Sequence, residues 1–233
     1  MKAVFDHTRD EAANIRTFFF KPEKPVRYTA GQYTELTLLH KADNRGQKRW
    51  FTLSSGPEQE FLTITTKHAD RDGSTFKKAL WSLKPGAEVH MAEPMGDFVL
   101  PKLIQTPLVF VAGGIGLTPF HSMAEWLATT GEIRPIKFIY GVRTEDEIIF
   151  QDTFQQTGIE PTVVVSDPSP AWGGERGRLS ADLILGLEKP SDDTLIYISG
   201  PEPMVEALEK DLKKAGIRKD RLVGDFFPNY TSI

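Results

Sequence analysis

The sequence predicts a two-domain protein with an antiparallel β-barrel in its N-terminal half and a parallel α/β sheet in its C-terminal half. Up to about Pro101 the apolar residues tend to alternate with polar ones, which is typical of half-buried strands. Beyond Thr106 strand-like and helix-like segments alternate, which is typical of a parallel sheet covered by helices. A length of 233 residues suffices for two small cores.

The N-terminal half, residues 1–101, is expected to form a six-stranded barrel with Greek-key connections. Glycine, proline and aspartate residues separate its candidate strands, which are Ala3–Phe5, Arg16–Phe20, Gln32–Leu39, Arg49–Ser54, Phe61–Lys67 and Glu88–Met91. One helix interrupts them, because Ser74 or Thr75 can cap a segment in which apolar residues recur at helical spacing, namely Phe76, Leu80 and Leu83.

The C-terminal half, residues 106–233, alternates strands with helices. Its candidate strands are Leu108–Ala112, Ile136–Tyr140, Thr162–Val165, Leu195–Ser199 and Arg221–Phe226, and its candidate helices are Pro119–Thr130, Glu145–Gln156, Ala181–Leu187 and Pro203–Ala215. Gly131 follows the first helix, and Thr144 and Glu147 have the spacing of a capping box. Lys102–Thr106, with prolines on both sides, is the expected domain boundary.

Composition excludes several classes of function. A net charge of −4 without a basic stripe argues against binding to nucleic acid. The absence of cysteine excludes disulfides, cysteine-ligated zinc and an iron–sulfur cluster held by this chain. We interpret the five histidines as solvent or packing residues and expect no metal site, because metal-ligand spacing is lacking among His7, His40, His68, His90 and His121. Without an apolar signal region or membrane-length run, a cytoplasmic setting is expected.

A glycine-rich turn joins the first strand of the second half to its first helix. It contains Gly113, Gly114 and Gly116, and bare backbone at the positive end of a helix can approach a diphosphate. The turn departs from the standard dinucleotide fingerprint, because Pro119 stands where a third glycine would fall. A tight turn with left-handed backbone would explain the same glycines, but the carboxyl end of a first parallel strand favours ligand binding.

The segment from Arg49 to Ser55 is the corresponding feature of the barrel half. Strand alternation puts Arg49 and Phe51 on one face, where they could hold a phosphate and pack beside a flat cofactor, with Thr52 on the other face. The alternative is an ordinary surface strand with a charged start. The Gly73–Thr75 segment at the predicted helix start is either a second anion site or a simple cap.

In combination these segments resemble the ferredoxin–NADP reductase superfamily of flavoproteins over nearly the whole chain. The segment from Arg49 to Ser55 is similar to the family motif Arg-x-Tyr-Ser/Thr-x-x-Ser, with Phe51 in place of tyrosine. The resemblance implies that Arg49 holds the flavin phosphate, Phe51 lies against the flavin and Thr52 bonds near its N5. The remaining residues expected to bind flavin are Ser54, Thr65, Lys67, Gly73, Ser74 and Thr75, the last three resembling a second phosphate loop.

The resemblance extends to the nicotinamide domain. It places Thr118 close to the nicotinamide ring, and the segment from Ser199 to Met204 is similar to a Cys-Gly-Pro-x-x-Met signature, with serine in place of cysteine. Asp225 and Phe226 belong to a segment like the family's acidic–aromatic ending. The residues expected to bind the dinucleotide are Gly113, Gly114, Gly116, Thr118, Arg143, Gly200, Pro201 and Met204, and Phe226 is expected beside the flavin.

The resemblance implies that hydride passes from NADH or NADPH to FAD, with FMN less expected, and that electrons continue to a protein acceptor such as ferredoxin, another iron–sulfur protein, flavodoxin or a haem protein. The expected catalytic residues are Thr52, Thr118, Ser199, Asp225 and Phe226. Arg143, helped by Arg176 or Arg178, is either a ligand for a 2′-phosphate or a solvated residue. Two alternatives are a free-flavin or small-molecule reductase, and a flavin-binding regulatory or electron-transfer subunit of a multi-component enzyme.

Overall fold

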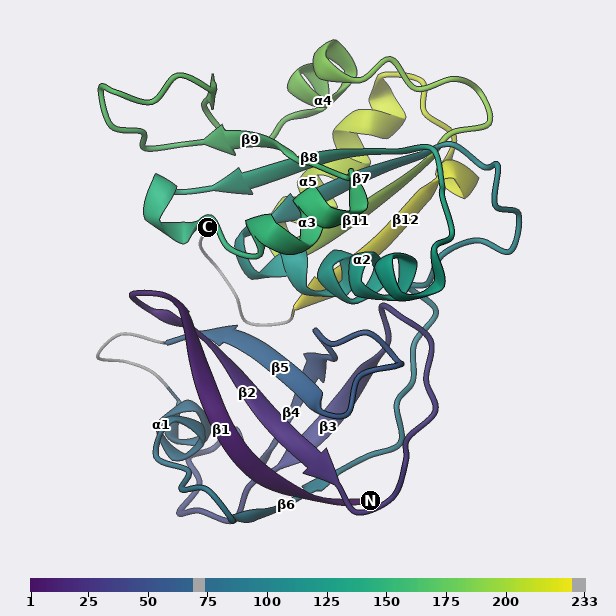
Figure 1. Ribbon diagram of the computed structural model, residues 1–233. Coiled ribbons are helices and arrows are strands. Elements are labelled where there is room, and N and C mark those ends of the chain that lie inside the picture. The colour runs from purple at the N-terminus through teal and green to yellow at the C-terminus, as the bar shows by residue number, and fades with distance from the viewer. Residues whose placement is uncertain (69–73, 228–233) are drawn as a thin grey trace.

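Two six-stranded sheets, one antiparallel and one parallel, organise the computed structural model, which describes residues 1–68 and 74–227. Figure 1 shows the antiparallel sheet curled into a barrel, with the parallel sheet and its helices beside one end of it. The predicted fold class is therefore confirmed. Within the described residues, no helix combines the length and apolar character needed to cross a membrane.

The barrel sheet has the strand order β4-β3-β6-β1-β2-β5. Its strands are β1 (Lys2–Ala12), β2 (Ile15–Pro22), β3 (Tyr33–Thr37), β4 (Lys48–Thr52), β5 (Leu62–Lys67) and β6 (Glu88–Met91). Alternate side chains, such as Phe18 and Phe20 on β2, are buried in the barrel core. Helix α1 (Thr75–Trp81) contributes Phe76 and Leu80 to the same core, and Ser74 caps it by accepting a hydrogen bond from the Lys77 amide.

The hairpin of β1 and β2 is longer than the predicted strand Ala3–Phe5. Its extension passes through the polar stretch from Asp6 to Glu11, where no apolar alternation reveals a strand. Backbone pairing with β2 nevertheless continues to Ala12, with irregularities in the register between Phe5 and His7 and between Asp10 and Ala12. A strand held mainly by its partner's backbone has no hydrophobic pattern to predict it.

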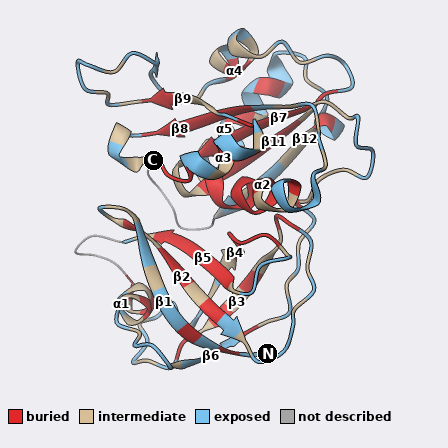
Figure 2. Cartoon of the chain, in the orientation of Figure 1, coloured by how far each residue is buried: buried red, intermediate tan, exposed pale blue. Residues whose placement is uncertain are grey.

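The parallel sheet has the order β10-β9-β8-β7-β11-β12. Its strands are β7 (Leu108–Gly113), β8 (Ile136–Val142), β9 (Thr162–Val165), β10 (Glu175–Arg176), β11 (Leu195–Pro201) and β12 (Leu222–Phe227). Its helices are α2 (Thr118–Thr130), α3 (Gln151–Thr157), α4 (Ala181–Leu187) and α5 (Glu202–Lys214), with short 3₁₀ turns η1 (Gly114–Leu117), η2 (Glu145–Glu147) and η3 (Lys219–Arg221). Figure 2 shows β7 buried along its length between the helical layers.

Two cores lie on opposite faces of this sheet. Along β7, Phe110 packs with residues of α2 and α3, whereas Val109 and Val111 pack with residues of α4 and α5. The strand therefore has no polar face, as expected for the centre of a parallel sheet. The α2–α3 core also contains Phe98, which lies before the expected domain boundary and packs 5.2 Å from the Tyr197 ring.

The predicted helix Glu145–Gln156 is wrong in its first half. Only η2 and α3 are helical, because the chain between them turns at Phe150, whose φ is 61°. Ile149 and Phe150 are buried in the core, and this tertiary packing outweighs local helix propensity. The capping box is also wrong, because the Thr144 side chain makes no capping bond and Glu147 instead pairs with Lys67 of the barrel.

Candidate functional site

The barrel opens between its edge strands β4 and β5, where the sequence places the flavin motif. The two strands meet just beyond β4, where the Ser54 amide donates to the Thr63 carbonyl at 2.9 Å. Within the described residues this is the backbone bond that joins the two edges, since β4 pairs with β3 and β5 pairs with β2. The outer side of an edge strand can bond to another group.

Arg49 lies on this edge strand, and one of its donor nitrogens makes no hydrogen bond within the described part of the chain. Its Nη1 donates to the Arg45 and Lys48 carbonyls, both at 2.6 Å, and its guanidinium lies 5.2 Å from the Phe76 ring centre. Its Nη2 is buried without a hydrogen-bond partner among the described residues, and burial lowers the pKa of the guanidinium. A buried donor of this kind is costly unless an acceptor reaches it, so the site fits an anionic phosphate.

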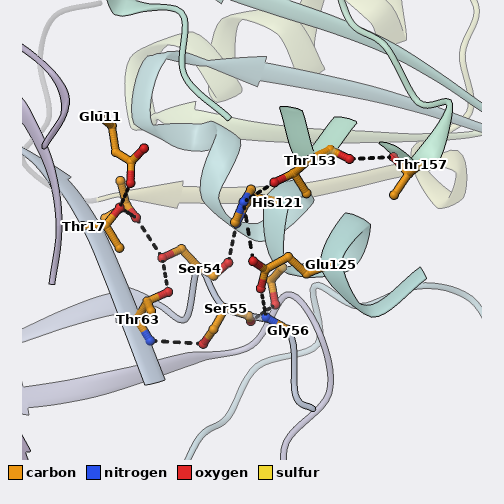
Figure 3. A network of polar contacts seen from close by, with 12 residues as sticks. Glu11, Thr17, Ser54, Ser55, Gly56, Thr63, His121, Glu125, Thr153 and Thr157 are labelled. Atoms are coloured by element: carbon orange, nitrogen blue, oxygen red, sulfur yellow. Dashed lines mark hydrogen bonds and ion pairs between the residues drawn. The ribbon is translucent and has the colours of Figure 1, made fainter. Parts of the chain in front are cut away.

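Phe51 and Thr52 follow on the same strand. The Phe51 ring lies 5.9 Å from that of Phe76, on the side occupied by Arg49, as strand alternation predicts. Thr52 is buried at the end of β4 on the other face. The Ser54 and Thr65 hydroxyls bond to each other at 2.9 Å, and Thr65 also bonds to Thr17, so these expected flavin ligands are already part of a buried hydroxyl chain (Figure 3).

A carboxylate occupies the second expected phosphate site. Asp43 accepts from the Thr75 amide at 3.1 Å and lies 3.9 Å from Nη2 of Arg49. Hydrogen bonds from the Thr75 and Arg45 amides lower the pKa of Asp43 to about 2. Ser74 is engaged as the α1 cap and Lys67 pairs with Glu147, while Gly73 lies outside the described residues.

The glycine turn lies at the carboxyl edge of the parallel sheet, between β7 and α2. Gly114 has a φ of 52°, and a Cβ built on it would meet nothing within 4 Å, so its bare backbone faces open space. Gly116 is different, because its Cβ would lie 2.2 Å from the Ser199 carbonyl oxygen. A Cβ on Gly113 would likewise lie too close to the Met204 side chain. The Thr118 hydroxyl donates a hydrogen bond to the Ile115 carbonyl at 3.1 Å.

The ends of β11 and β12 complete this edge. Ser199 is fully buried and stands in register with Ala112 on one side and Asp225 on the other, and Gly200 and Pro201 close the strand. Burial raises the pKa of Asp225 to about 6, and the Ser199 hydroxyl opposes part of that rise. Phe226 is 46% exposed one residue further on. In Figure 1 β12 ends close to the barrel.

Arg143 follows β8 at the same edge, two residues beyond Gly141, which stands in register with Gly113. Its guanidinium is 3.7 Å from the carboxylate of Asp167, which follows β9, and both side chains are mostly exposed. Arg176 instead donates to the carbonyls of Ser169 and Trp172 in the loop after β9. The structure therefore places an acidic and a basic side chain, Asp167 and Arg143, together where the coenzyme ribose was expected.

Sequence reasoning missed several polar residues of the site. Asp43 lies in an irregular loop, and Asp167 in another, where no pattern marked either side chain. Three residues of α2, His121, Ser122 and Glu125, contact the barrel directly. A usable signal existed for these, because His121 and Ser122 stand beside Phe120 and Met123 on the buried part of the helix. Polar residues at such positions usually have a buried partner.

Comparisons with known proteins agree with this fold. Residues 110–210 match the family described as the oxidoreductase NAD-binding domain. Flavohemoprotein A of Dictyostelium discoideum is 27% identical over 244 residues, covering 99% of this chain and 61% of that protein. NADH oxidoreductase HCR of Escherichia coli is 27% identical over 214 residues, covering 91% and 64%. The chain thus spans less than two thirds of the length of either relative.

The fold has a close match among solved structures. A ferredoxin NADP+ reductase from Neisseria gonorrhoeae with bound FAD and NADP gives a TM-score of 0.81 at 18% identity, covering 97% of this chain and 98% of that one. The whole chain therefore has the fold of the ferredoxin reductase-like FAD- and NAD-binding proteins. Residues 110–210 in its second half match an oxidoreductase NAD-binding domain.

Proposed function

We propose that this chain is an NAD(P)H-dependent flavoprotein reductase that passes electrons from a nicotinamide coenzyme, through FAD, to a separate protein. The observation that carries the proposal is Nη2 of Arg49 on the barrel edge, a buried donor without a hydrogen-bond partner among the residues described, which lies 3.9 Å from the Asp43 carboxylate. A phosphate could accept a hydrogen bond from this donor, and the barrel is joined directly to the glycine turn through α2. A flavin phosphate at Arg49 would bring the rest of the cofactor toward that junction.

Each residue of the edge has a role in this proposal. FAD, when bound, accepts hydride and releases electrons singly. Arg49 would hold its phosphate, Phe51 would cover one side of its ring and Thr52 would offer a hydroxyl. Gly114 would admit the coenzyme diphosphate to bare backbone, because its surroundings are open. Asp225, with a pKa of about 6, would hold a proton part of the time near neutral pH.

NADH is the coenzyme that we propose. Arg143 alone would suit a 2′-phosphate, but Asp167 lies 3.7 Å from it and balances its charge. A carboxylate at this place repels a second phosphate and accepts a hydrogen bond from a free ribose hydroxyl. The name of the Escherichia coli relative, an NADH oxidoreductase, supports the same choice.

We propose a haem protein as the electron acceptor. The relative from Dictyostelium discoideum is named a flavohemoprotein, and 39% of its length lies outside the region that this chain matches, since the match covers 61% of it. This chain has no cysteine to hold an iron–sulfur cluster itself. A haem acceptor would supply the one-electron centre that a flavin can reduce.

The visible spectrum of the purified protein, before and after anaerobic addition of NADH or NADPH, tests this function. We expect a flavin band that NADH bleaches faster than NADPH. A colourless protein that cannot be reconstituted with FAD would refute flavin binding. A yellow protein that neither coenzyme bleaches would refute the reductase and favour an electron-transfer subunit. Faster turnover with small dyes or free flavin than with haem proteins would refute the proposed acceptor.

A further inference from the structure

Three side chains of helix α2 form hydrogen bonds with the backbone of three consecutive barrel residues. The His121 Nδ1 lies 2.6 Å from the Ser54 carbonyl oxygen, and the Ser122 hydroxyl donates to the Ser55 carbonyl at 2.6 Å. The Gly56 amide donates to the Glu125 carboxylate, also at 2.6 Å (Figure 3). We call these three contacts the α2 clamp. They give the two halves one fixed register along the chain from 54 to 56.

His121 is the member of the clamp whose chemistry is most restricted. A carbonyl oxygen only accepts, so Nδ1 must carry the ring proton, and Nε2 accepts from the Thr153 hydroxyl at 3.1 Å. The ring is 4% exposed and stacks on Phe150 with 3.7 Å between centroids. Burial lowers the pKa of His121 to about 4 and holds the ring neutral.

Charged groups around the ring come from two elements. The Glu125 carboxylate, one helical turn further on α2, lies 3.8 Å from Nε2 of His121. Arg9 of β1 lies close enough to lower the pKa of the same histidine. Burial also raises the pKa of Glu125, although its bond from Gly56 favours the charged form. The neutral ring therefore lies beside the Glu125 carboxylate, with its donor committed to the Ser54 carbonyl.

The clamp lies on a short path between the two ligand signatures. On α2, His121 is one turn beyond Thr118, where the helix leaves the glycine turn. On the barrel, Ser54 is two residues beyond Thr52, and residues 52–56 are all buried. Close-packed segments transmit displacement with little compliance. A shift of α2 against Ser54 would therefore move the glycine turn relative to β4.

We propose that His121 is a positioning residue that sets the separation of the nicotinamide and the flavin through its bond to Ser54. The inference rests on the proposed reductase function. Hydride transfer depends steeply on the distance and alignment of the two rings, and a misplacement of about 1 Å can cost roughly 100-fold in rate. Loss of the bond should therefore slow flavin reduction more than it weakens binding of either ligand.

Two amide substitutions separate this role from simple packing. The side-chain nitrogen of His121→Asn can stand near the place of Nδ1 and still donate to Ser54, whereas that of His121→Gln reaches toward Nε2. In stopped-flow reduction at saturating NADH, we expect His121→Gln to lower the limiting rate about tenfold or more. His121→Asn should stay within about threefold of the natural protein. The dissociation constants of FAD and NADH should change less than about twofold in both variants.

Hydrogen–deuterium exchange gives a readout that does not depend on turnover. Residues 54–56 should exchange faster in His121→Gln than in His121→Asn, because the clamp has lost its central bond. His90→Gln, a change at an exposed histidine of β6, is the matched control and should alter neither measurement.

Four results would overturn the inference. One is His121→Gln reducing its flavin at the natural rate. Another is equal loss in the Asn and Gln variants, and a third is unchanged exchange at residues 54–56. Loss of FAD in proportion to the rate would show a structural role only. If neither coenzyme reduced the natural protein, both the proposed function and this inference would be wrong. That result is distinct from the other four.

Discussion

At the scale of single residues, Arg49 and Asp43 would act on the proposed flavin phosphate in opposite senses. Arg49 keeps a buried nitrogen without a hydrogen-bond partner, and Asp43 lies beside it on the Thr75 amide. A carboxylate and a phosphate favour the same donors, so flavin binding must compete with Asp43. The strength of flavin retention should therefore reflect the balance of the two side chains.

Arg49→Ala should weaken FAD binding roughly tenfold or more, because it removes a charge-assisted contact of about 1.5–3 kcal/mol. Asp43→Asn should strengthen binding, because it removes the competing negative charge. Fluorescence titration of the flavin-free protein with FAD measures both changes. Glu23→Gln, an exposed acid elsewhere on the barrel, is the matched control for loss of one charge. Weaker binding in Asp43→Asn would show instead that this acid supports Arg49.

The sequence correctly predicted the face of the strand on which Arg49 lies, but it gave no sign of Asp43 beside it. Arg49 begins a strand with a recognisable order of residue types, and alternation correctly placed it on the face of Phe51. Asp43 lies in the loop between β3 and β4, whose path depends on contacts with Thr75, 32 residues further along the chain. Local pattern carries no information about such a contact.

At the scale of elements, the glycine turn has two kinds of glycine. Gly114 faces open space, whereas Gly116 lies against the backbone of β11 at Ser199. From the sequence, both glycines were predicted to let a ligand approach the backbone. A glycine required by packing and one required by a ligand look alike in a sequence. The geometry assigns Gly116 to packing.

Gly116→Val should therefore lower stability as well as NADH binding. Its first added carbon would lie 2.2 Å from the Ser199 carbonyl oxygen, so the turn must shift away from β11. A typical overpacking cost is about 1–3 kcal/mol. Thermal unfolding and NADH titration measure the two effects, and bound FAD should be retained. Gly173→Val, at a position with open surroundings, is the control. An unchanged melting temperature would contradict this account.

Elements with a hydrophobic period were predicted well and elements without one were not. The strands Glu88–Met91 and Thr162–Val165 and the helix Ala181–Leu187 have the predicted bounds. The helix over 145–156 failed because Ile149 and Phe150 are buried from a non-helical segment. Burial that depends on distant elements is decided by the whole molecule, and a local period does not reveal it.

At the scale of the whole molecule, two buried groups give opposite pH dependences. Burial lowers the pKa of His121 from 6.5 to about 4, so between these values the unfolded chain binds the extra proton and stability falls on acidification. Burial raises the pKa of Asp225 from 3.8 to about 6, so in nearly the same window the folded chain holds the extra proton and stability falls as pH rises. Each effect amounts to roughly 3 kcal/mol.

Urea unfolding at pH 7 and pH 4.5 should reveal the contribution of His121 to the pH dependence when Asp225 is replaced, and that of Asp225 when His121 is replaced. Relative to the natural protein, His121→Asn should gain stability on acidification and Asp225→Asn should lose it. The comparison cancels groups common to all three proteins, Glu125 included. Identical pH dependence in the natural protein and both variants would show that neither group titrates as its burial indicates.

Phe98 ties the two halves together in a further respect. Together with Ile15 and Ala30 it belongs to the same hydrophobic cluster as residues of the parallel sheet and of helices α2 and α3, although all three precede the expected domain boundary. Cutting the chain there would leave apolar surface uncovered on both fragments. We therefore expect the two halves to unfold as one cooperative unit. Because a ligand that binds only the folded state stabilises the entire unit, a flavin held by the barrel would protect the coenzyme half from unfolding as well.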